Sequence, residues 1–170
     1  MSSNPEQSYT TYKKLNRYFQ ITSQEYETLL KTLPNIEKMP TGDVLNNFST
    51  LTKMGLTSHQ IIARPNVLTS SPQILQLKAA LCSLSGNSPT SFLSSNYKQA
   101  ANKTYARFRY LEGLNSKQKL IYTTEDKFEE QTGLDNELLL NMYPLNADHA
   151  NLVMQQYEEY LNQKEELDAN

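Results

Sequence analysis

The chain has little cysteine, histidine and glycine, and it has no tryptophan. Its one cysteine, Cys82, cannot form an internal disulfide, so the sequence does not indicate an oxidising compartment, and we expect Cys82 to be an inert core thiol. The two histidines, His59 and His149, have no partners at a spacing typical of metal ligands. We therefore expect no metal and no other cofactor.

Long apolar runs and catalytic signatures are also absent. No apolar stretch approaches the roughly 18 residues of a membrane-spanning helix, so we expect a soluble chain with no membrane partner. The sequence has no glycine-rich phosphate loop, no nucleophile elbow and no paired-histidine helix. Acidic pairs such as Glu125–Asp126 and Glu129–Glu130 fit a solvated helix surface better than a catalytic carboxylate pair. We expect a protein that is not an enzyme.

A short proline motif occurs twice, as LPNI at 33–36 and RPNV at 64–67. Pro34 and Pro65 are 31 positions apart, a period that helical repeat proteins use. Aligning 21–55 with 56–86 also matches an aliphatic-Thr-Ser opening, a second proline and a closing glycine. We expect Pro34, Pro65, Gly55 and Gly86 to be structural repeat positions.

Helix-end signals recur along the whole chain. Thr22 with Glu25, and Thr57 with Gln60, have the spacing of a capping box. Four of the five glycines stand where left-handed helix ends are expected: Gly55, Gly86, Gly113 and Gly133. Apolar residues recur between these marks at intervals of three and four, and no segment alternates convincingly with a period of two. We predict nine helices, at 9–20, 23–32, 42–54, 58–64, 72–85, 95–112, 116–122, 125–132 and 148–166.

These patterns predict an all-α fold in which right-angled helical hairpins stack as a short α-solenoid of about three to four repeats. A hairpin of this kind cannot bury its apolar face alone and needs neighbours. A helix or arm at 1–20 precedes repeats at 21–55, 56–86, 87–113 and a degenerate 114–147. The acidic helix at 148–170 is expected to cap the last repeat. The alternatives are that it forms a surface for other proteins, or that it competes with nucleic acid for the basic segment.

The run from Leu51 to Gly86 resembles the repeat of the mitochondrial transcription termination factor (mTERF) family. The shared features are a Gly-Leu opening, a proline after the first short helix, and spaced leucines along the second helix. The resemblance implies repeats of two helices and a short tight helical turn, curved into a superhelix whose basic concave face binds nucleic acid. It also implies a non-catalytic role in organellar transcription and a mitochondrial location. The N-terminus shows no clear presequence, and an intracellular location is expected otherwise.

Charge is distributed unevenly, although the net charge is only −2. Between 98 and 119 there are six basic residues and one acid, whereas twelve acids and two lysines follow from 120 onward. Aromatic residues alternate with the cations of the basic segment, a composition that suits phosphate contacts beside stacking platforms. The predicted contacts to DNA or RNA are Lys98, Lys103, Arg107, Arg109, Tyr110, Lys117 and Lys119.

Two alternatives stay open at this point. Helical spacing places Lys103, Arg107 and Tyr110 on one face of a helix, beside an aromatic stripe that includes Tyr105 and Phe108. The aromatic residues could instead belong to the core, with the cations on a solvated face. The whole chain could then be a helical-repeat adaptor that binds proteins and no nucleic acid.

Overall fold

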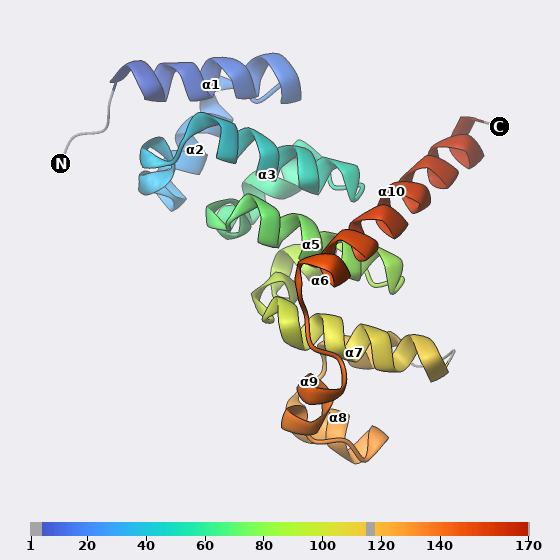
Figure 1. Cartoon of the computed structure of the whole chain (residues 1–170). Coiled ribbons are helices and arrows are strands. Elements are labelled where there is room, and N and C mark those ends of the chain that lie inside the picture. The colour runs from blue at the N-terminus through green and yellow to red at the C-terminus, as the bar shows by residue number, and fades with distance from the viewer. Residues whose placement is uncertain (1–4, 115–117, 170) are drawn as a thin grey trace. The chain divides into compact units, whose positions relative to one another are not determined.

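The computed structural model describes residues 5–114 and 118–169, and all regular structure in these ranges is helical (Figure 1). The all-α prediction is thereby confirmed. The chain divides into two compact units, an N-terminal unit, Met1–Leu75, and a C-terminal unit, Gln76–Asn170.

The N-terminal unit alternates α-helices with 3₁₀ helices, which are labelled η. Both predicted capping boxes are present: Thr22 Oγ1 accepts from the Glu25 amide at 3.1 Å, and the Glu25 carboxylate accepts from the Thr22 amide at 3.0 Å. Thr57 and Gln60 repeat the arrangement at the start of the fourth helix. The elements are α1 (Pro5–Phe19), α2 (Ser23–Thr32), η1 (Pro34–Lys38), α3 (Thr41–Lys53), α4 (Ser58–Ala63), η2 (Pro65–Thr69) and the start of α5 (Pro72–Leu84).

One buried side chain from each of several elements builds the core of the N-terminal unit. Leu15, Leu29, Ile36, Phe48 and Ile61 are completely buried. Asn47 is a completely buried polar residue of α3, and its amide nitrogen donates to the carbonyls of Leu68 at 2.9 Å and Ser70 at 2.8 Å. These two bonds fasten the end of η2 to α3.

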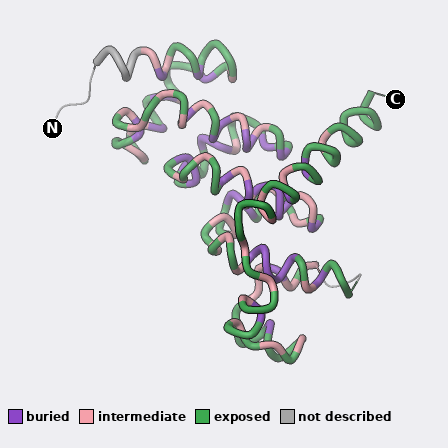
Figure 2. The backbone as a smooth tube through the Cα atoms, in the orientation of Figure 1, coloured by how far each residue is buried: buried purple, intermediate pink, exposed green. Residues whose placement is uncertain are grey.

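The C-terminal unit packs around α7, which has five consecutive buried residues from Thr104 to Phe108 (Figure 2). Phe128 of α8, Leu139 of α9 and Tyr157 of α10 belong to the same apolar cluster. The elements after α5 are α6 (Pro89–Ser94), η3 (Asn96–Lys98), α7 (Ala101–Leu114), η4 (Gln118–Tyr122), α8 (Glu125–Thr132), α9 (Asn136–Met142) and α10 (Ala147–Ala169).

Among the described elements, three sets that share no helix have the order helix, 3₁₀ helix, helix: α2–η1–α3, α4–η2–α5 and α6–η3–α7, which we call the repeat segments. Pro34 and Pro65 are the first residues of η1 and η2. Proline suits this position because its φ is already helical and it has no amide hydrogen to leave unpaired. Gly55 and Gly86 have positive φ values of 103° and 72°, as the repeat alignment predicts.

The structure corrects the predicted elements at several positions. The predicted helix at 95–112 is two elements, η3 and α7, and the described part of the predicted helix at 116–122 is the 3₁₀ helix η4. The six-residue α6 and the seven-residue α9 were not predicted, because helices this short hold too few apolar residues for periodicity to show. Gly113 lies inside α7, without the positive φ of a helix end.

Candidate nucleic-acid interface

Arg107, predicted as a nucleic-acid contact, is buried in the C-terminal unit and only 1% exposed. Its NH1 group donates to the carbonyls of Thr123 at 2.7 Å and Ile121 at 3.0 Å, and its guanidinium carbon lies 4.5 Å from the centroid of the Phe128 ring. Burial lowers the pKa of Arg107, and the nearby Glu125 carboxylate partly offsets this. Arg107 thus joins α7 to η4 and α8, and its guanidinium is not available to phosphates.

The prediction that Arg107 contacts nucleic acid is wrong because α7 is covered by protein on more than one face. Helical spacing places Arg107 beside the aromatic stripe, and the sequence alone does not show how far around the helix the covering extends. Tyr105 and Phe108 are buried, as the core alternative expects. These two rings are therefore packed against protein and do not form free stacking platforms.

Lys103 pairs with a carboxylate of α8. Its Nζ donates to Glu125 Oε1 at 2.5 Å, and both side chains are at the surface. This hydrogen bond, followed by the charge of Lys103, lowers the pKa of Glu125. A phosphate that binds Lys103 would have to compete with Glu125.

Arg109 is exposed, but its guanidinium lies against two tyrosine rings. The guanidinium carbon is 5.8 Å from the Tyr105 centroid and 5.6 Å from the Tyr143 centroid, and NH1 donates to the Tyr105 hydroxyl at 2.8 Å. Arg109 Nε also lies 3.8 Å from Glu112 Oε2. Tyr110 is half-buried, with its ring centroid 6.4 Å from that of Phe128.

Lys98 and Lys119 keep exposed side chains that make no ion pair with any described residue. Lys98 ends η3 and Lys119 lies in η4. Lys119 borders a hollow of about 600 Å³ that is also lined by Gln118, Leu120 and Gln131. Lys117 lies outside the described residues.

An exposed cation stands in or beside each of the four 3₁₀ helices of the described chain, a regularity that the charge count along the sequence missed. Lys38 ends η1, and Arg64 directly precedes η2. Like Lys98 and Lys119, both are exposed and make no ion pair within the described ranges. Aligning the two proline motifs does not pair these cations, because Lys38 lies four residues after Pro34 and Arg64 lies directly before Pro65. We call these four residues, Lys38, Arg64, Lys98 and Lys119, the 3₁₀ cations.

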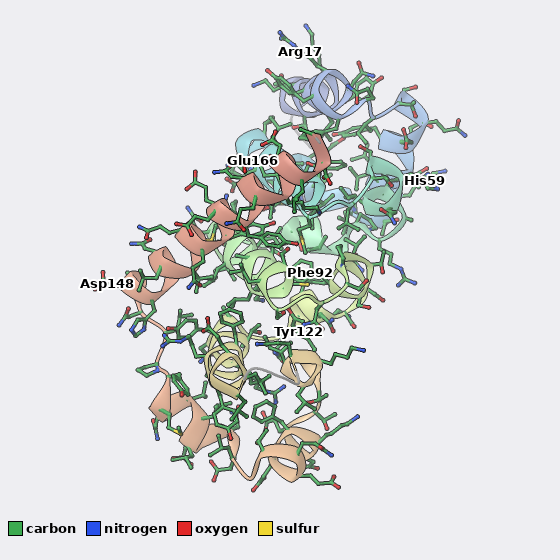
Figure 3. All side chains as sticks on the ribbon, turned by 90° about the vertical axis from the view of Figure 1, so that its right-hand side faces the viewer. Arg17, His59, Phe92, Tyr122, Asp148 and Glu166 are labelled. Carbon is green, nitrogen blue, oxygen red and sulfur yellow. The ribbon has the colours of Figure 1, made fainter. Side chains whose placement is uncertain are left out.

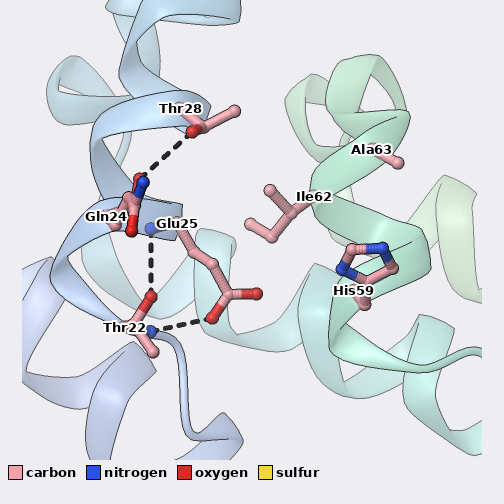
Figure 4. A pocket seen from close by; sticks show the side chains of 7 residues that line it. All are labelled: Thr22, Gln24, Glu25, Thr28, His59, Ile62 and Ala63. Carbon is pink, nitrogen blue, oxygen red and sulfur yellow. Dashed lines mark hydrogen bonds between the residues drawn. The ribbon is translucent and has the colours of Figure 1, made fainter.

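The pocket of about 290 Å³ in the N-terminal unit lies between α2 and α4 (Figure 4). His59 and Glu25 both line it, but the Glu25 carboxylate already accepts the Thr22 amide in the capping box. Among the described residues, no three His, Cys, Asp or Glu side chains gather closely enough to hold a metal ion. Cys82 is buried, as predicted, and burial raises its pKa to about 11, so it carries almost no thiolate at neutral pH.

No described helix, including the 23-residue α10, has the long uncharged apolar stretch that a bilayer crossing requires.

In comparisons with models of known protein families, with curated proteins and with solved structures, the chain matches none.

Proposed function

We propose that this chain is a non-catalytic helical-repeat protein that binds nucleic acid through the 3₁₀ cations. The observation that carries the proposal is the placement of one exposed cation in or beside every 3₁₀ helix of the described chain. The three repeat segments, each of two helices and a short tight turn, fit the repeat that the mTERF resemblance implies. That resemblance also supports a role in organellar transcription and a mitochondrial location.

Phosphate chemistry explains why a cation repeated with the fold suits this ligand. A nucleic-acid backbone carries one charge per nucleotide, and each phosphate that a protein cation neutralises releases condensed counterions. A repeat protein that presents an exposed cation in or beside each 3₁₀ helix can neutralise several phosphates. Such contacts position the protein without reading base sequence, so we propose binding by charge and shape for DNA or RNA alike.

The test compares two variants with the same change in net charge. The first replaces the 3₁₀ cations (Lys38→Gln, Arg64→Gln, Lys98→Gln, Lys119→Gln). The control replaces four exposed lysines that lie outside the 3₁₀ helices (Lys31→Gln, Lys53→Gln, Lys127→Gln, Lys164→Gln). Binding of labelled duplex DNA and single-stranded RNA is measured by fluorescence anisotropy between about 50 and 200 mM salt.

We expect the intact chain and the control to lose affinity as salt rises, with similar slopes. The 3₁₀ variant should bind at least about tenfold more weakly at low salt, with a slope on duplex DNA that is shallower by about 0.9 for each phosphate that is no longer neutralised. Equal reductions of affinity in the two variants would mean that net charge alone decides binding, and the proposal would be wrong.

A protein-binding adaptor is the second candidate function. The observation that favours it is the use of two predicted contacts within the C-terminal unit: Arg107 is buried, and Lys103 is paired with Glu125 at the surface. Failure of the intact chain to bind either nucleic acid at low salt would select this function.

A further inference from the structure

The two halves of α10 have different surroundings. Val153 and Tyr157, in the first half, are buried in the core cluster of the C-terminal unit. From Glu158 to Ala169 every residue is exposed except Leu161, which is half-buried. The first half of α10 therefore packs on the C-terminal unit, and the second half has an uncovered surface (Figure 2).

Three large apolar side chains lie on the uncovered side of α10. Leu152 is 56% exposed, Tyr160 36% and Leu167 76%. At about 100° per residue, the three project within an arc of about 80°, and the rise of about 1.5 Å per residue spreads them over roughly 22 Å. We call them the α10 stripe. This length matches the contact that an amphipathic helix makes with a partner helix.

Negative charge predominates on the second half of α10. At about 100° per residue, Glu159 and Glu166 project next to the stripe, whereas Glu158 and Glu165 project from the opposite side of the helix. Five carboxylates lie between 158 and 169, against one cation, Lys164. All five are exposed, and none forms an ion pair with a described residue. Glu166 extends away from the helix in the side-chain view (Figure 3). The acids are Glu158, Glu159, Glu165, Glu166 and Asp168.

We propose that the α10 stripe and its carboxylates are a docking surface for a basic amphipathic helix of a partner protein. The apolar stripe provides the area to be buried, and the carboxylates select a partner whose apolar face is bordered by Lys or Arg. A second copy of α10 would bring like charges together, and nucleic acid would be repelled. The proposal goes beyond nucleic-acid binding, because it concerns a different surface and a different class of ligand.

The test uses the full chain and a synthetic 18-residue helical peptide, with leucines on one face and lysines bordering them. A second peptide, in which glutamate replaces lysine, is the charge control. The stripe variant is Leu152→Gln, Tyr160→Gln, Leu167→Gln, and the matched variant removes three exposed apolar side chains elsewhere, Ile74→Gln, Leu138→Gln, Met142→Gln. Calorimetric titration measures the dissociation constants, and circular dichroism confirms that both variants keep their helix content.

We expect the basic peptide to bind the intact chain and the matched variant equally, and the stripe variant at least about tenfold more weakly. The glutamate peptide should not bind. The proposal is wrong if the basic peptide binds all three proteins equally or none of them, or if sedimentation shows a dimer of the intact chain that the stripe variant does not form. The stripe variant should retain the salt-dependent nucleic-acid binding of the intact chain, so the two proposals can fail separately.

Discussion

The first and third repeat segments have the same element order, but their central 3₁₀ helices are held in different ways. In α2–η1–α3, Pro34 begins the 3₁₀ helix and Ile36 anchors it in the core, completely buried. In α6–η3–α7, the 3₁₀ helix has neither a proline nor a buried residue. Its Tyr97 carbonyl instead accepts from Lys78 Nζ at 2.9 Å.

Polar side chains take the place of the apolar anchor in the third segment. Gln99, directly after η3, donates to the Ile121 carbonyl at 2.8 Å and to the Thr104 hydroxyl at 3.0 Å, and its side-chain oxygen accepts from Arg107 NH1 at 3.3 Å. Gln99 and Arg107 thus join η3, α7 and η4. The same backbone order can therefore be stabilised by one buried aliphatic side chain or by a polar network, and a cation in the network is withdrawn from the surface.

The largest effect is expected for Arg107→Met. Removing the guanidinium leaves the carbonyls of Ile121 and Thr123 buried without these donors, and we expect the free energy of unfolding to fall by about 3 kcal/mol. Urea denaturation followed by circular dichroism measures it. Arg109→Met is the control: this arginine is exposed, so its replacement should cost about 1 kcal/mol or less. Similar costs at the two positions would remove the distinction between the buried network and the surface.

The next effect concerns Gln99→Ala, which we expect to lower the free energy of unfolding by about 2 kcal/mol, since it removes a hydrogen bond to the Ile121 carbonyl and a partner of Arg107. Because both residues belong to one network, the cost of the double variant with Arg107→Met should differ from the sum of the single costs by at least about 0.5 kcal/mol. Gln24→Ala, at an exposed position of the first segment, is the control. Additive costs would show that the two residues act independently.

Much of the first segment could be predicted from the sequence, because its signals are local. The bounds of α2 follow from the Thr22 capping box and from Pro34, and they agree with the structure at 23 and 32. The third segment has no proline at its turn, and the sequence therefore predicts η3 as part of a longer helix. Its hydrogen bonds to the Ile121 carbonyl join residues 14 and 22 positions apart, a separation that periodicity does not cover.

The candidate site could be predicted only in part, for a related reason. Local charge density identified Lys98 and Lys119, which are exposed, together with Arg107, which is buried. It did not identify Lys38 and Arg64, because their common feature is a position beside a 3₁₀ helix and not the density of cations around them. Whether a cation reaches solvent depends on how many faces of its helix are covered by other elements. Helical spacing within one segment does not show how many faces are covered.

Two glycines should respond to alanine with opposite signs. Gly55, after the first segment, has a φ of 103°, where a Cβ is strained, and we expect Gly55→Ala to lower the free energy of unfolding by about 1 kcal/mol. Gly113 lies inside α7, and a Cβ there would meet nothing within 4 Å. Gly113→Ala should therefore raise the free energy of unfolding by about 0.5 kcal/mol. Thermal unfolding of both variants measures the shifts. The same sign at both positions would contradict the different backbone roles assigned to these glycines.

The smallest effect is a pH dependence of the exposed link between α7 and α8. The hydrogen bond from Lys103, and then its charge, lower the pKa of Glu125 in the folded state. The resulting stabilisation is present above the unfolded pKa of about 4.3 and is lost as the pH falls through the lower folded value. The melting temperature of Glu125→Gln should therefore be slightly below that of the intact chain at pH 7, with a gap that closes below about pH 4 and narrows in high salt. Asp126→Asn, at an adjacent exposed carboxylate without an ion pair in the described residues, is the control. A difference in melting temperature that persists at about pH 3 would mean that the destabilisation does not come from the charge of Glu125. The link between α7 and α8 would then depend on the buried contacts of Arg107 and not on the Lys103–Glu125 ion pair.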